Sequence, residues 1–196
     1  MNTSDIKTLT RGAVTAAVFL MLILLFPINH RLVQSLLLII YPIPIALFCL
    51  SSSKKWCLIV FAACLLLSFI LMPPLIALFF AMPGLAIGFV YGTWFKNAGR
   101  KLSILLVGCL YLLFTAAEIF AYSYLIGFDI FGFIYDYAFI AADILTGMPI
   151  WLLPHGVTQS IILFALLPGF IVLSIVRSAA FIFLTSKLTG IVNIKR

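Results

Sequence analysis

Charged residues are scarce in this chain. They make up 9% of the 196 residues, whereas hydrophobic residues make up 65%, and the mean hydropathy is +1.31. Because soluble domains carry about 25% charged residues, this composition excludes an ordinary soluble protein and indicates an integral membrane protein. A helical span needs about 20 apolar residues to cross a hydrocarbon core of about 30 Å. The length therefore suffices for about six or seven spans and leaves no room for a separate soluble domain.

Familiar enzyme motifs are also missing. The sequence contains no HExxH, GxSxG or GxxxxGK[ST], and its two histidines are His30 and His155. These motifs would supply metal ligands, a nucleophile or a phosphate cradle. The four cysteines form no CxxC pair, and the predicted outer loops contain none of them, so neither a disulfide framework nor a metal site is predicted. We expect no cofactor and no catalytic activity, with an intramembrane enzyme as the third-ranked alternative.

Six apolar segments are predicted to span the membrane as helices. They cover about residues 12–28, 32–50, 56–72, 75–95, 103–127 and 158–184. Basic residues mark alternate boundaries of these segments. They are Lys7 and Arg11, then Lys54 and Lys55, then Lys96, Arg100 and Lys101, and finally Lys187, Lys195 and Arg196. The positive-inside rule therefore places both termini in the cytoplasm.

Residues 130–153 form a seventh apolar segment, but they do not fit a span. Asp136 and Asp143 would lie in the hydrocarbon, and the basic carboxyl terminus would lie outside. The predicted fold is therefore an all-α integral membrane protein with six transmembrane helices in one bundle. It forms a single domain over residues 1–196, with a long outer loop between the fifth and sixth helices.

Three of the five acidic residues lie in that outer loop. Asp129, Asp136 and Asp143 are spaced seven residues apart, which puts them on nearly the same face of a helix. One interpretation is that this face meets a ligand. The other is that it belongs to a helix at the membrane interface and meets water.

A ligand site is predicted around Glu118, because an ionisable group inside a span is a functional candidate. Tyr122 lies above it in the same span, and the outer loop adds Asp129, Asp136, Trp151 and His155. Acids and aromatic rings suit a cationic or aromatic small molecule. The alternative for Glu118 is a structural hydrogen bond or a protonated, buried acid. The other charge inside a span, Arg177, is expected nearer the inner side, where it can extend to lipid phosphate.

Small residues at four-residue spacing predict two close helix contacts. Ala13 and Ala17 lie four apart in the first span, and Gly84, Gly88 and Gly92 lie on one face of the fourth. The glycine row is expected to pack against a neighbouring span of the same chain.

The segments "AVTAA", "YPIPIALF" and "PGLAIGFVYG", followed by a long loop before the last span, together resemble a known family. The chain is similar to the substrate-capture (S) subunit of energy-coupling-factor (ECF) vitamin transporters. It also resembles related uncharacterised bacterial membrane proteins of the same apparent fold.

The resemblance implies a function and partners. The chain would bind a vitamin-like molecule at the outer face of a bacterial cell membrane and work with a membrane coupling subunit and a pair of ATPases. By position, the substrate would contact Glu118, Tyr122, Trp151 and His155, and Ala13 and Ala17 would face the coupling subunit. An alternative is a scaffold that does not transport and acts through helix contacts. Nucleic acid is not an expected partner, because the positive charges are divided among short loops.

Overall fold

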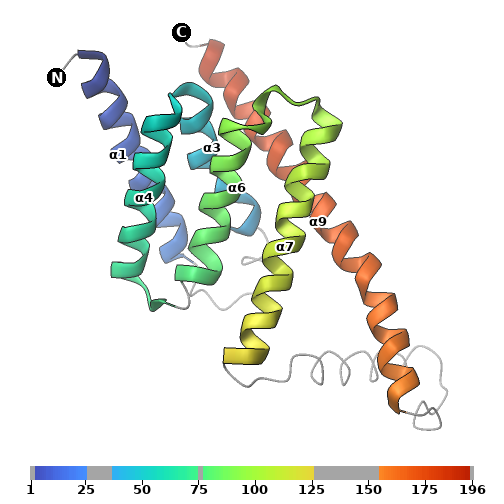
Figure 1. Cartoon of the computed structure of the whole chain (residues 1–196). Coiled ribbons are helices and arrows are strands. Elements are labelled where there is room, and N and C mark those ends of the chain that lie inside the picture. Colours follow the sequence, from blue (N-terminus) through green and yellow to red (C-terminus); the bar gives the residue numbers. More distant parts are fainter. Residues whose placement is uncertain (1–2, 26–36, 75–76, 126–154, 195–196) are drawn as a thin grey trace. The chain divides into compact units, whose positions relative to one another are not determined.

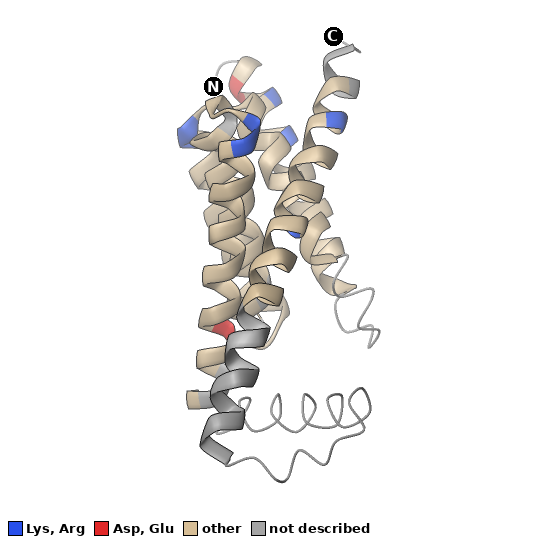
Figure 2. Cartoon of the chain, turned by 90° about the vertical axis from the view of Figure 1, so that its right-hand side faces the viewer, with Lys and Arg blue, Asp and Glu red and all other residues tan. Residues whose placement is uncertain are grey.

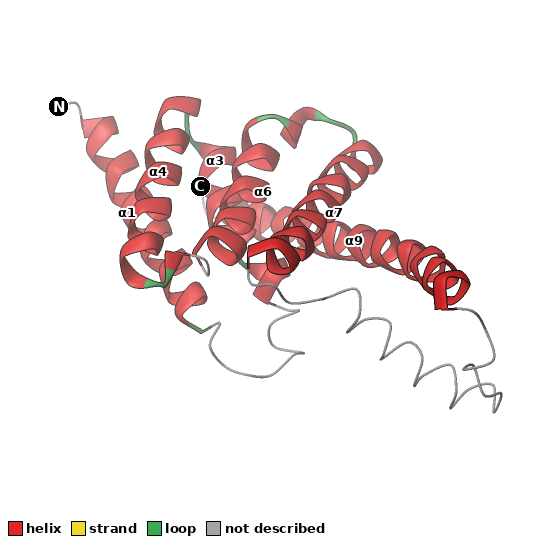
Figure 3. Ribbon diagram, turned by 60° about the horizontal axis from the view of Figure 1, so that its bottom comes forward, coloured by secondary structure: helices red, strands yellow, loops and turns green. Residues whose placement is uncertain are grey.

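The computed structural model describes residues 3–25, 37–74, 77–125 and 155–194. In these ranges all regular structure is helical, as Figure 3 shows. The elements, labelled in Figure 1, are α1 (Thr3–Leu24), α3 (Pro42–Ser51), α4 (Lys54–Leu71), the π-helical η1 (Ala77–Ala81), α6 (Met82–Thr93), the 3-10 helix η2 (Phe95–Asn97), α7 (Arg100–Leu125) and α9 (His155–Ile194).

Four helical stretches are long and apolar enough to cross a membrane. They are Thr3–Leu24, Lys54–Leu71, Arg100–Ala121 and Pro168–Gly190. Two shorter apolar helices, Leu37–Ser51 and Ala77–Thr93, correspond to the second and fourth predicted spans. The all-α membrane class predicted from the sequence is therefore confirmed, with four of the six predicted spans as full-length candidates.

Two of the helices extend beyond the predicted spans. Helix α1 begins at Thr3, before the predicted span at about residue 12, because hydropathy marks the membrane boundary and polar residues can extend a helix beyond it. In this polar part the Thr8 and Thr10 hydroxyls donate to the Ser4 and Ile6 carbonyls at 2.9 and 3.0 Å. Helix α9 has 40 residues and contains the whole of the predicted span 158–184.

The described helices group into two units. The first comprises residues 1–111 and 175–196, and the second comprises residues 112–174. The first unit holds α1, α3, α4, η1, α6 and parts of α7 and α9. The single domain over residues 1–196 stays a prediction.

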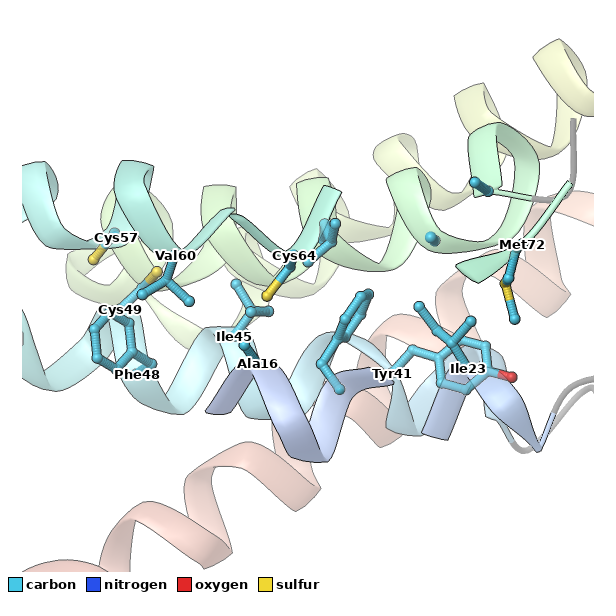
Figure 4. Close-up of a cluster of buried hydrophobic side chains, with 14 of the residues drawn as sticks. Ala16, Ile23, Tyr41, Ile45, Phe48, Cys49, Cys57, Val60, Cys64 and Met72 are labelled. Carbon is cyan, nitrogen blue, oxygen red and sulfur yellow. The ribbon is translucent and has the colours of Figure 1, made fainter. Parts of the chain in front are cut away.

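Buried apolar side chains form the core of the first unit. Figure 4 shows side chains of α1, α3 and α4 in this core lying next to one another. Its labelled members are Ala16, Ile23, Tyr41, Ile45, Phe48, Cys49, Cys57, Val60, Cys64 and Met72. Alanine and cysteine are small, and they allow helices to approach closely where lipid provides no hydrophobic drive.

Prolines shape the beginnings of two helices. Pro42 occupies the first turn of α3 and Pro83 the first turn of α6. Proline fits there because the first N–H groups of a helix have no partner within it. The π-helical turn Ala77–Ala81 immediately precedes Met82 and Pro83, where the missing N–H of proline interrupts the regular α-helical bonding.

Basic residues gather at one end of the first unit. Figure 2 shows most of the Lys and Arg segments near the end at which the amino terminus lies. In the described ranges, these basic residues lie in the first part of α1, at the beginnings of α4 and α7, and in the last part of α9. The alternate boundaries that carry the positive charge in the sequence are thus brought to the same end of this unit.

Candidate functional site

Helix α1 has a buried face and an exposed face. Gly12, Ala16, Phe19 and Ile23 are buried, whereas Ala13 and Ala17 are exposed. The buried face packs closely on α4, because a Cβ atom added at Gly12 would lie 2.7 Å from Val60 Cγ2. Ala13 and Ala17 are predicted to contact a partner. They therefore lie on the face of α1 that the described part of the chain leaves open.

The glycine row of α6 lies directly against α3. A Cβ atom added at Gly84 would lie 3.1 Å from Tyr41 Cβ, and one at Gly88 would lie 3.1 Å from Ile45 Cβ and still closer to the Pro42 carbonyl oxygen. At Gly92 it would meet Cys49 Cβ and would lie 3.0 Å from the Ala46 carbonyl oxygen. All three glycines are buried. The two backbones are therefore in contact along three turns, which is possible only without side chains on that face of α6.

A hydrogen bond from Tyr111 on α7 supports the chain where it enters α3. The Tyr111 hydroxyl donates to the Leu38 carbonyl oxygen at 3.1 Å. In a continuous helix this carbonyl would accept the N–H of residue 42, but residue 42 is proline and has none. Tyr111 is buried, and it supplies from another helix the donor that Pro42 lacks.

Helix α9 is joined to α7 and α6 within the first unit. The Ser178 hydroxyl donates to the Ile104 carbonyl oxygen at 2.8 Å. A Cβ atom added at Gly108 would lie 3.4 Å from Ser178 Oγ, so the helices are close at this point. One turn after Arg177, the Phe181 ring meets the Tyr91 ring edge to face with centroids 5.2 Å apart. Small and polar groups thus fix the position of α9 on its neighbours.

Arg177 lies within the apolar part of α9, among residues long and apolar enough to cross a membrane. Its expected position nearer the inner side stays a prediction. Its side chain is half-buried. A charge at this depth is a functional candidate.

Glu118 is a half-buried residue of the second unit. It lies seven residues before the end of α7, Arg100–Leu125. Tyr122 follows one turn later on α7, and residues four apart share a helix face. His155 is the first residue of α9. Asp129, Asp136, Asp143 and Trp151 lie outside the described residues.

Tyr111 and Ser178 are the polar residues that sequence reasoning missed. Their signal is indirect, since a hydroxyl in a span gives no indication of which carbonyl it will meet. Among the described residues, no group of three or more His, Cys, Asp or Glu side chains is placed to hold a metal ion.

A family model of predicted membrane proteins, DUF2232, matches residues 14–191 of the chain. The match begins inside α1 and ends near the end of α9, so it includes nearly all of the described helices. No curated protein and no solved structure matches the chain. Since the model covers most of its length, the chain belongs to the DUF2232 family of predicted membrane proteins.

Proposed function

We propose that this protein is the substrate-capture subunit of an ATP-driven importer of the energy-coupling-factor type. It would lie in the cell membrane with six spans and both termini in the cytoplasm. It would bind a small molecule at the outer face and carry out no catalysis itself. The observation that carries this proposal is the exposure of Ala13 and Ala17 on α1.

An exposed pair of alanines suits contact with another membrane helix. Spacing of four residues puts both methyl groups on one side of the helix, and only a methyl group would separate the two backbones. Ala16, about 60° around the helix from Ala13 and about 100° from Ala17, is already in the core. The exposed pair begins two residues after Arg11, close to the basic end. The positive-inside rule assigns that end to the cytoplasm, where the ATPases of such an importer act.

The ligand would bind toward the other end of the spans. Glu118 lies near the end of the α7 window that is opposite to Arg100. We propose that Glu118 and Tyr122, with Asp129, Asp136, Trp151 and His155 of the neighbouring segments, form the substrate site. A cationic or aromatic vitamin-like molecule suits these side chains.

Leucine substitutions on the two faces of α1 test the partner contact. Ala13→Leu and Ala17→Leu should abolish copurification of the coupling subunit and ATPases while the isolated chain melts normally, because both sites are exposed. Ala16→Leu is the matched control. It should destabilise the isolated chain by about 1–3 kcal/mol through overpacking, since Ala16 is buried.

Pull-down from native membranes, with mass spectrometry of the recovered subunits, decides the outcome. Normal recovery of the ATPase pair by both exposed-face variants would refute the interface. The second candidate function is a scaffold that does not transport and acts through helix contacts, to which the exposed Ala13 and Ala17 are equally suited. Native mass spectrometry separates the two, because only a capture subunit should retain a small molecule.

A further inference from the structure

Seven exposed cations lie at the basic end of the first unit. They are Lys7, Arg11, Lys54, Lys55, Arg100, Lys101 and Lys187, and Figure 2 shows how the Lys and Arg segments gather there. Of the acidic residues in the described ranges, only Asp5 belongs to this end. The surface is therefore strongly positive.

Four of these cations do not stabilise the helices that carry them. Lys54 and Lys55 begin α4, and Arg100 and Lys101 begin α7, and neither helix has an acidic residue in its first turn. The macrodipole favours negative charge at a helix amino terminus and disfavours positive charge. An anion bound at this end would offset the unfavourable interaction of these four cations with the helix dipoles.

Within the described ranges, internal contacts engage only one of the seven charges. In the described ranges none of the seven cations forms an ion pair with an acidic side chain. Lys187 lies over the Phe183 ring of its own helix, with its Nζ 5.7 Å from the ring centroid. The remaining six are exposed and available to an external anion.

The composition of the surface favours lipid over protein as that partner. Five of the seven cations are lysines, and lysine is depleted in protein interfaces, where arginine is enriched. Lysine is a flexible point charge that suits phosphate groups in varied positions. Trp94, at the end of α6, is 62% exposed, which is typical of a side chain at the level of lipid headgroups.

The position of the cations along the spans agrees with this assignment. The candidate spans of α4 and α7 begin at Lys54 and Arg100 themselves, and Lys187 lies in the last part of α9, seven residues before its end. Lipid phosphates lie at this depth of a bilayer. We propose that this basic end is a binding surface for the phosphate headgroups of anionic phospholipids, a role beyond the proposed capture function.

Lipid retention by the purified full-length chain tests the proposal. The protein is incubated with dioleoylphosphatidylglycerol or dioleoylphosphatidylcholine in detergent, and retained lipid is measured by native mass spectrometry. The anionic lipid should be retained preferentially. Because each cation near an anionic surface changes binding by about fivefold, Lys54→Gln with Lys55→Gln should weaken it by about 25-fold.

Charge-preserving variants and a second site make the result specific. Lys54→Arg with Lys55→Arg should retain the anionic lipid as the native chain does. Arg100→Gln with Lys101→Gln should weaken retention of the anionic lipid in the same way at another helix. This second pair keeps the test valid if circular dichroism shows that one of the glutamine variants does not fold. Equal retention of both lipids by the native chain would overturn the proposal. So would glutamine variants that keep the anionic lipid but lose a protein partner, which would identify a protein interface.

Discussion

Gly88→Ala is the most direct test of the contact between α3 and α6. The new Cβ atom would lie 3.1 Å from Ile45 Cβ and 3.2 Å from the Ala46 backbone nitrogen, and closest to the Pro42 carbonyl oxygen. Two of these three atoms belong to the backbone. A flexible side chain could turn away, but here the helices themselves must separate.

The expected loss of stability follows from two opposing effects. Overpacking a close-packed site costs about 1–3 kcal/mol, and the backbone contacts place Gly88 at the upper end. Alanine is favoured over glycine in a helix by up to about 1 kcal/mol, which offsets part of this. We expect a net loss of about 2 kcal/mol for Gly88→Ala. For Gly84→Ala we expect about 1 kcal/mol or less, because its close contact is with one atom, Tyr41 Cβ.

Titration with sodium dodecyl sulfate in mixed micelles, followed by circular dichroism, measures these differences. Gly190→Ala is the matched control, since Gly190 lies in α9 and an added Cβ atom would meet nothing within 4 Å. It should unfold at the native midpoint or slightly above it. If Gly88→Ala and Gly190→Ala unfolded at the same midpoint, the close approach of α3 and α6 would be refuted.

Three further variants address other parts of the protein. Tyr111→Phe removes the donor to the Leu38 carbonyl oxygen while keeping the ring. The folded chain should lose about 1–3 kcal/mol of stability, because a buried acceptor is left without a donor. An unchanged unfolding midpoint would contradict this role. Glu118→Gln should weaken binding of a cationic ligand by about 1.5–3 kcal/mol, as measured by titration calorimetry, and an unchanged affinity would remove Glu118 from the site. A cysteine introduced at Asp136 should react with an impermeant maleimide from outside intact cells, whereas labelling only from the cytoplasmic side would contradict the six-span topology.

The sequence by itself determined the class of this protein and the positions of its main helices. Composition alone indicated a membrane protein, because 65% hydrophobic and 9% charged residues cannot be arranged as a soluble domain. The basic residues at alternate boundaries predicted a common end, since charges cannot enter the hydrocarbon. The spacing of Gly84, Gly88 and Gly92 indicated a close helix contact, because glycine has no side chain and its positions are read directly from the sequence.

Only the tertiary structure decided which surfaces meet. Ala13, Ala16 and Ala17 are the same residue type in one helix, yet Ala16 is buried and the other two are exposed, because the direction of the α1 core face depends on its neighbours. Likewise, the need for a donor at the Leu38 carbonyl follows from Pro42, but the choice of Tyr111, 73 residues away, does not. Periodicity fixes a helix and its faces from local interactions, whereas a hydrogen bond between distant helices depends on how their axes are placed in space.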